Sequence, residues 1–78
     1  MHVFQKLLVM LSVWNVAPAD ARIYATPDGP KGRRLQFTFA PADRPTADRV
    51  FDELDSRGLG PSRSEDGLTV QADVSDYD

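Results

Sequence analysis

The chain has 78 residues, no cysteine and a formal net charge of −3 at pH 7. This length predicts one small domain with little room for a catalytic cleft, and the absence of cysteine excludes disulfides and thiolate metal sites. Residues 1–38 carry five basic and two acidic side chains, whereas residues 39–78 carry four basic and ten acidic ones. The acidic half favours a basic partner and disfavours contact with bare nucleic acid.

The first apolar segment, residues 3–16, fits two kinds of element. With a period of two, Leu7, Val9, Leu11 and Val13 form one apolar face, and the β-branched valines favour a strand. With a period of 3.6, an apolar stripe also forms, and Leu, Met, Gln and Lys favour a helix. We predict a strand, with a helix as the alternative. The helical stripe comprises Val3, Leu7, Met10, Leu11 and Trp14.

A β-hairpin is predicted next. Residues 22–26 form a short strand candidate, and Leu35, Phe37 and Phe39 alternate with polar residues over 33–40. Between them, residues 27–32 contain two prolines and two glycines, which are typical of turns. The hairpin should therefore have a long loop with a basic tip.

Residues 41–58 carry the best helix pattern. Pro45 suits the first turn, with Asp43, Arg44 or Thr46 as the capping candidate and Gly58 as the stop. A polar loop is predicted at 62–67. Residues 68–74 alternate as a strand, and 75–78 form an acidic tail. The apolar stripe of the helix comprises Ala47, Val50, Phe51 and Leu54.

These elements predict one α+β domain spanning residues 1–78, with no internal repeat. In the order β-β-β-α-β, one helix would pack on a face of a mostly antiparallel sheet. One helix covers four strands poorly, so Leu8, Met10, Trp14 and Tyr24 would form an exposed apolar patch, unless residues 3–16 are the second helix. The predicted core comprises Leu7, Val9, Leu11, Val13, Ile23, Leu35, Phe37, Phe39, Val50, Phe51, Leu54, Leu68, Val70 and Val74.

No residue pattern predicts catalysis, a cofactor or a metal site. His2 is the only histidine and lies at the terminus, and none of the serines sits in a nucleophile motif. The aspartates lack the ligand spacing and glycine turn of a calcium loop. We therefore expect a non-enzymatic protein.

The strongest functional feature is an acidic strip on the predicted helix. Asp48, Asp52 and Asp55 stand at i, i+4 and i+7 and share one helix face. An ordinary solvated face is the alternative, favoured by possible Arg49–Glu53 and Glu53–Arg57 pairs. Asp73 and Asp76 extend the acidic character at the end of the last strand, and Trp14 is a further candidate for partner contact.

These features lead to a hypothesis of a small acidic inhibitor that covers a basic, nucleic-acid-binding surface of another protein. Size and charge suit phage proteins of the anti-CRISPR type. A cytoplasmic location, no membrane insertion and possible homodimer formation go with this hypothesis.

Two alternatives stay open. Lys31, Arg33 and Arg34 form a weak nucleic-acid-binding candidate at the hairpin loop. Residues 1–21 resemble a weak signal segment, because one lysine precedes an apolar run and small residues follow it; the protein would then be a secreted or anchored structural domain.

Overall fold

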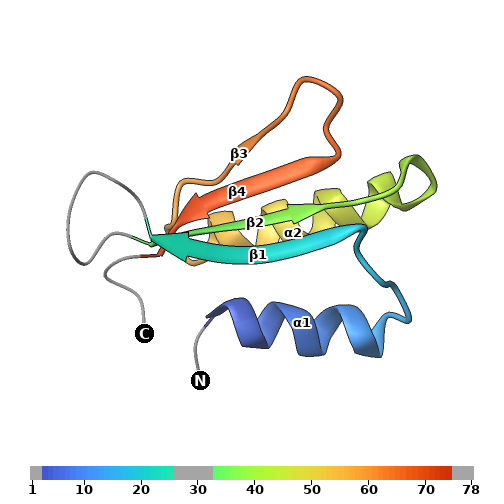
Figure 1. Cartoon of the computed structure of the whole chain (residues 1–78), viewed down its shortest axis with the longest axis horizontal. Helices are drawn as coiled ribbons and strands as arrows, with labels where there is room; N and C mark the ends of the chain where they lie inside the picture. Colours follow the sequence, from blue (N-terminus) through green and yellow to red (C-terminus); the bar gives the residue numbers. More distant parts are fainter. Residues whose placement is uncertain (1–2, 26–32, 75–78) are drawn as a thin grey trace.

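The computed structural model describes residues 3–25 and 33–74, which form two helical segments and four strands in two layers (Figure 1). A single 3₁₀ turn, Pro41–Asp43, leads into the second helix. This arrangement confirms the predicted α+β class. The elements are α1 (Val3–Val13), β1 (Asp20–Ala25), β2 (Arg33–Thr38), α2 (Arg44–Ser56), β3 (Ser62–Arg63) and β4 (Thr69–Asp73).

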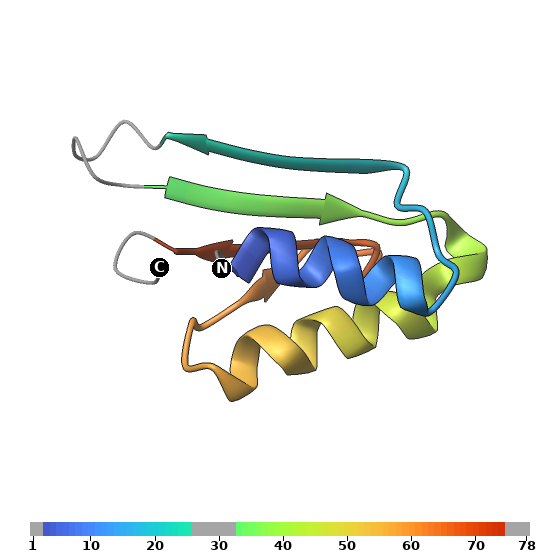
Figure 2. The same cartoon turned by 90° about the horizontal axis from the view of Figure 1, so that it is seen from below.

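The four strands form one antiparallel sheet in the order β1-β2-β4-β3. Both helices lie on the same face of this sheet and run in opposite directions (Figure 2). Their buried residues belong to the same core as Leu35, Phe37 and Val70 of the central strands. An antiparallel sheet tolerates one covered and one open face, which is the arrangement here.

The strand predicted for residues 3–16 is wrong, and the helical alternative is correct. Val3, Leu7 and Leu11 are fully buried, which is the spacing of one helix face. Val9 and Val13, expected in the core, are 54% and 77% exposed. Tertiary packing decides this segment, because the apolar face of four strands needs more cover than α2 alone provides.

An aromatic stack joins α1 to the centre of the sheet. The ring centroid of Phe37 lies 5.2 Å from that of Phe4 and 6.3 Å from that of Phe39. Phe37 is fully buried, so this stack sits inside the core. Beyond the apolar surface it removes from water, each such aromatic pair contributes about 0.5–1.5 kcal/mol.

The second half of the chain largely follows the sequence pattern. Pro45 lies in the first turn of α2, Asp43 is the N-cap residue, and Gly58 adopts φ +74° after the helix. Val70 and Val74 are buried as predicted, whereas Leu68, Ile23 and Phe51 are only partly buried. The loop predicted at 62–67 contains the two-residue strand β3, because Ser62 and Arg63 pair with Gln71 and Val70.

The topology repeats, although no repeat was expected from the sequence. Helix, strand and strand follow one another twice, and β2 and β4 meet at the centre with Gln36 opposite Gln71. The register between β2 and β4 is symmetric about that pair. The first strand of each half, β1 or β3, lies at an edge of the sheet. The two helices share a short pattern: Val3-Phe4 precede Leu7, and Val50-Phe51 precede Leu54. The valines and leucines are buried and the phenylalanines partly so.

The open face of the sheet is a connected polar layer. Arg34 donates from Nε to Gln71 Oε1 at 2.8 Å and from NH1 to Asp73 Oδ1 at 2.9 Å. Gln71 in turn donates to Gln36 Oε1 at 3.1 Å, and the hydroxyls of Thr38 and Thr69 lie 3.2 Å apart. These bonds satisfy the cross-strand polar groups, so this face needs no further cover.

Candidate protein-binding surface

The acidic strip predicted from the sequence exists on α2. Asp48, Asp52 and Asp55 are all exposed on this helix, whose opposite side is anchored in the core by Ala47, Val50 and Leu54. In the part of the chain that the structure describes, neither the Asp52 nor the Asp55 carboxylate accepts a hydrogen bond or forms an ion pair. Two carboxylates of this strip therefore face solvent with no cationic partner among residues 3–25 and 33–74.

The arginines around the strip are held by other groups. Arg63 NH1 lies 2.5 Å from Asp48 Oδ1, and Arg63 also donates to the backbone carbonyl of Gly67 at 2.7 Å. Arg57 NH1 pairs with Glu53 Oε2 at 2.6 Å, as the spacing predicted. Asp48 is therefore partly neutralised, and the net negative charge of the strip is concentrated at Asp52 and Asp55.

Arg49 contacts an aromatic ring. Its guanidinium carbon lies 4.1 Å from the ring centroid of Trp14, which packs half-buried against the core. This cation–π contact joins α2 to the end of α1 and stabilises by about 0.5–1 kcal/mol at a partly exposed site. Trp14 thus has a structural role within the fold, with Arg49 covering its ring.

The predicted acidic strand end is divided by the structure. Asp73 is exposed but forms an ion pair with Arg34, which is also bonded to Gln71. This internal pairing reduces the charge that Asp73 offers to a partner. Asp76 lies outside the described residues.

The basic loop candidate is not one surface in the described region. Lys31 lies outside the described residues. Arg33 and Arg34 are neighbours in β2, so their side chains project to opposite faces of the sheet. Because Arg34 is engaged by Asp73, the described part of the chain places these two arginines in separate environments.

The periodicity of the sequence does not reveal a second acidic group, because this group lies in a turn. Glu65 and Asp66 are exposed between β3 and β4, and the Asp66 carboxylate accepts hydrogen bonds from the Ser64 hydroxyl and from the Leu68 N–H. The Ser64 bond, followed by the Leu68 bond, lowers the pKa of Asp66 below 3.8. The Ser-x-Asp spacing is the sequence signal for such a turn.

We expect the carboxyl of Asp66 to titrate below its ordinary pKa in an NMR pH titration. A lowered pKa in the folded state means that the ionised form stabilises the fold, and this stabilisation is lost as the pH falls through the folded-state pKa. Replacing Asp66 with Asn should make the acid dependence of the unfolding free energy shallower. A midpoint at or above 3.8 would contradict the hydrogen-bonded turn.

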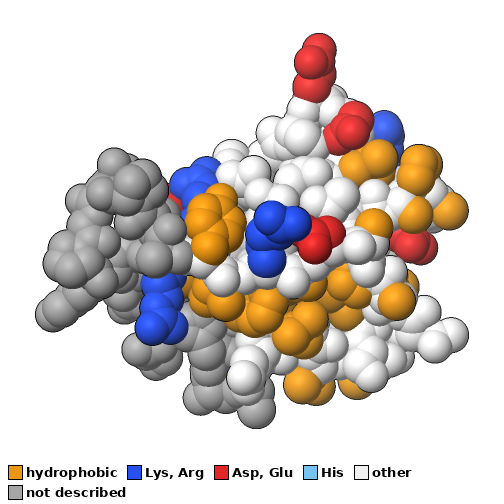
Figure 3. Space-filling model, in the orientation of Figure 1, with side chains coloured by type: hydrophobic (Ala, Val, Ile, Leu, Met, Phe, Trp, Pro, Cys, Tyr) orange, Lys and Arg blue, Asp and Glu red, His pale blue; other side chains and the backbone are white. Residues whose placement is uncertain are grey.

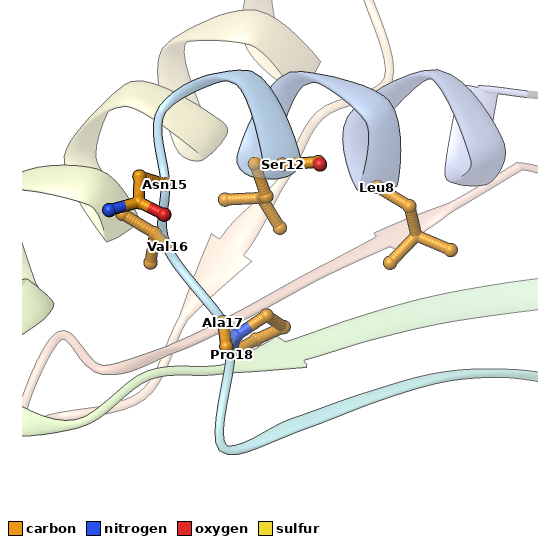
Figure 4. Close-up of a pocket in the computed structure, with 7 residues that line it drawn as sticks. Leu8, Ser12, Asn15, Val16, Ala17 and Pro18 are labelled. Atoms are coloured by element: carbon orange, nitrogen blue, oxygen red, sulfur yellow. The ribbon is translucent and has the colours of Figure 1, made fainter.

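Residues 3–25 and 33–74 were also searched for a metal site, a membrane-spanning helix and a ligand pocket. No group of three or more metal-ligating side chains comes together there, and neither α1 nor α2 has the length and apolar character needed to cross a bilayer. A shallow pocket of about 360 Å³ lies where α1 leads into β1 (Figure 4). Its lining includes Leu8, Ser12 and Pro18 and contains no titratable side chain.

Comparison of the chain with protein-family models, curated proteins and solved structures finds no match.

Proposed function

We propose that the protein is a non-enzymatic binding module whose acidic α2 surface (Asp48, Asp52 and Asp55) docks on a basic surface of another protein. The observation that supports this most directly is the pair of exposed, uncompensated carboxylates on a helix that the core holds rigidly. A rigid helix presents such charges with little loss of conformational freedom on binding.

The kind of partner that best matches this acidic surface is a nucleic-acid-binding protein. Its phosphate-contacting lysines and arginines would meet Asp52 and Asp55, so that the module competes with nucleic acid for the same surface. Inhibitors of the anti-CRISPR type work in this general way, and we place the protein in that functional class as a proposal. Association should be fast at low salt and slower at high salt.

Charge reversal of the strip tests this function. We expect Asp52→Lys with Asp55→Lys to abolish partner binding without loss of fold. Asp55 lies near the helix C-terminus, so a lysine there should stabilise α2 by about 0.3–1 kcal/mol through the helix dipole. Binding is measured by calorimetry with the partner, and stability by thermal unfolding followed by circular dichroism.

A matched control carries Asp28→Lys with Glu65→Lys, which changes the net charge equally but leaves α2 and the strip intact. The partner is first captured from the native host with the wild-type chain as bait and identified by mass spectrometry. It should bind the control, fail to bind the strip variant, and release its nucleic acid when the wild-type chain is added. Equal affinity for the two variants would refute the acidic strip as the binding surface.

A further inference from the structure

The two edges of the sheet differ sharply in length and cover. β3 has only two residues, and its Arg63 is bonded to Gly67 and to Asp48 of α2. β1 has six residues and, within the described chain, pairs only with β2. Its outer edge therefore presents a row of backbone donors and acceptors, which another strand can use.

A shallow groove between α1 and the segment that leads into β1 lies on the helix side of the sheet. The side chain of Leu8 projects from α1 toward the strands (Figure 4). Ser12 lies one turn further along α1, above the segment that leads through Pro18 into β1. Leu8 is 37% exposed, and Ile23 is only partly buried on the helix-side face of β1. In the space-filling view, hydrophobic side chains follow the lower border of β1 as a band (Figure 3).

The order of side chains in β1 is complementary to a second copy of itself. In an antiparallel pair centred on Ile23, Arg22 of each copy lies opposite Tyr24 of the other on the open face of the sheet. Ile23 lies opposite Ile23 on the groove side, and position 21 lies opposite position 25. Arginine facing an aromatic ring is a favourable pair, and Arg22 and Tyr24 are both exposed.

Two other registers, centred on Arg22 and on Ala21, are poorer. Centring the pair on Arg22 places the two Arg22 side chains opposite each other, which is destabilising. Centring it on Ala21 brings Asp20 opposite Arg22 but moves Ile23 opposite position 19, outside the strand. Of the centres Ala21, Arg22 and Ile23, charge and length therefore favour Ile23.

We propose that two copies of this chain associate through β1, antiparallel and centred on Ile23, to form a two-fold symmetric dimer with one continuous eight-stranded sheet. The same edge serves both copies, as a two-fold interface requires. Ile23 and Leu8 of each copy then cover one another along the groove. This interface uses the β1 edge and leaves the acidic strip of α2 free, so it stands independently of the proposed function.

A cysteine scan tests the register in the otherwise cysteine-free chain. In the proposed pairing, the two Cα atoms of residue 23 lie about 4.5–5.5 Å apart, within the range of a disulfide. Ile23→Cys should therefore cross-link rapidly under mild oxidation, whereas Ala21→Cys and Arg22→Cys should cross-link slowly. Intact-mass measurement under non-reducing conditions reports the yield for each variant.

A charge test addresses the native interaction without cross-linking. In the Tyr24→Arg variant, the new arginine of each copy lies opposite Arg22 of the other, so two pairs of like charges form. The association constant, measured by analytical ultracentrifugation, should fall by about tenfold. Adding Arg22→Glu to this variant creates two Glu–Arg pairs and should restore the dimer. Val13→Ser, on the exposed side of α1 away from Leu8, is the control and should leave the association constant unchanged.

A wild-type dimer with this pattern of cross-linking and rescue supports the proposal. A wild-type chain that stays monomeric up to millimolar concentration would overturn it, leaving the edge to a strand from a different protein. Equal cross-linking at positions 21, 22 and 23, or a dimer unaffected by Tyr24→Arg, would equally overturn the Ile23-centred pairing. Loss of partner binding by the Asp52 and Asp55 variant would leave this result untouched.

Discussion

Removal of residues 1–19 is expected to leave the rest of the chain without a stable fold. The deletion takes away Val3, Leu7 and Leu11, which are at most 1% exposed, and the ring of Phe4 that stacks on Phe37. Truncating one such leucine to alanine costs about 2–5 kcal/mol. A domain of this size has a total unfolding free energy of roughly 3–5 kcal/mol. The free-energy cost of losing all of these contacts is larger than that total.

Circular dichroism and the dispersion of amide NMR signals measure this outcome. The full-length chain should unfold cooperatively, and the truncated chain should show neither a transition nor dispersed signals. A full-length control with Val9→Ser and Val13→Ser removes apolar groups from the exposed side of α1 and should keep the fold. A truncated chain that still unfolds cooperatively would contradict the role of α1 in the core.

The same experiment bears on the alternative of a secreted protein. A signal segment ending at Ala19 or Ala21 would carry α1 away with it, because α1 ends at Val13. Intact-mass measurement of the native protein shows whether residues 1–21 are retained. We expect them to be retained, because Val3, Leu7 and Leu11 complete the core.

The second large effect is expected within α1 itself. Leu7→Ala should lower the unfolding free energy by about 2–5 kcal/mol, because Leu7 is fully buried and its truncation leaves a cavity. Val13→Ala should change it by no more than about 0.5 kcal/mol, because Val13 is 77% exposed. Chemical denaturation at one protein concentration measures both values.

This pair of substitutions distinguishes the helix from the strand. In a strand, Leu7 and Val13 would lie on the same face with Val9 and Leu11, and the two truncations would have similar effects. In the helix, only Leu7 and Leu11 of these four residues point into the core. Comparable losses for Leu7→Ala and Val13→Ala would therefore contradict the structure of α1.

The reasons for the success and failure of the sequence patterns are physical. Residues 33–40 and 68–74 were correctly predicted as strands because one face is buried and the other is polar, which produces strict alternation. For residues 3–16, apolar residues occupy both periods, and local propensities of Leu, Met and Val oppose one another. Segments of this kind take the form that completes the core.

The acidic strip was predictable, but the ion pairing of its carboxylates was not. Spacing along a helix placed Asp48, Asp52 and Asp55 on one face. The engagement of Asp48 by Arg63 depends on β3, a two-residue strand with no sequence signal of its own. In the same way, the Arg34–Asp73 pair joins residues that are distant in the sequence and adjacent across β2 and β4.

Composition and periodicity alone establish a small cysteine-free α+β domain, with an acidic amphipathic helix followed by an alternating strand. These properties depend on near neighbours in the chain, where side-chain spacing dictates which face is apolar. The identity of α1, the neutralised member of the acidic strip and the open edge of β1 come from contacts between segments far apart in sequence. Such contacts follow from the way four strands and two helices share one core, which no local pattern encodes.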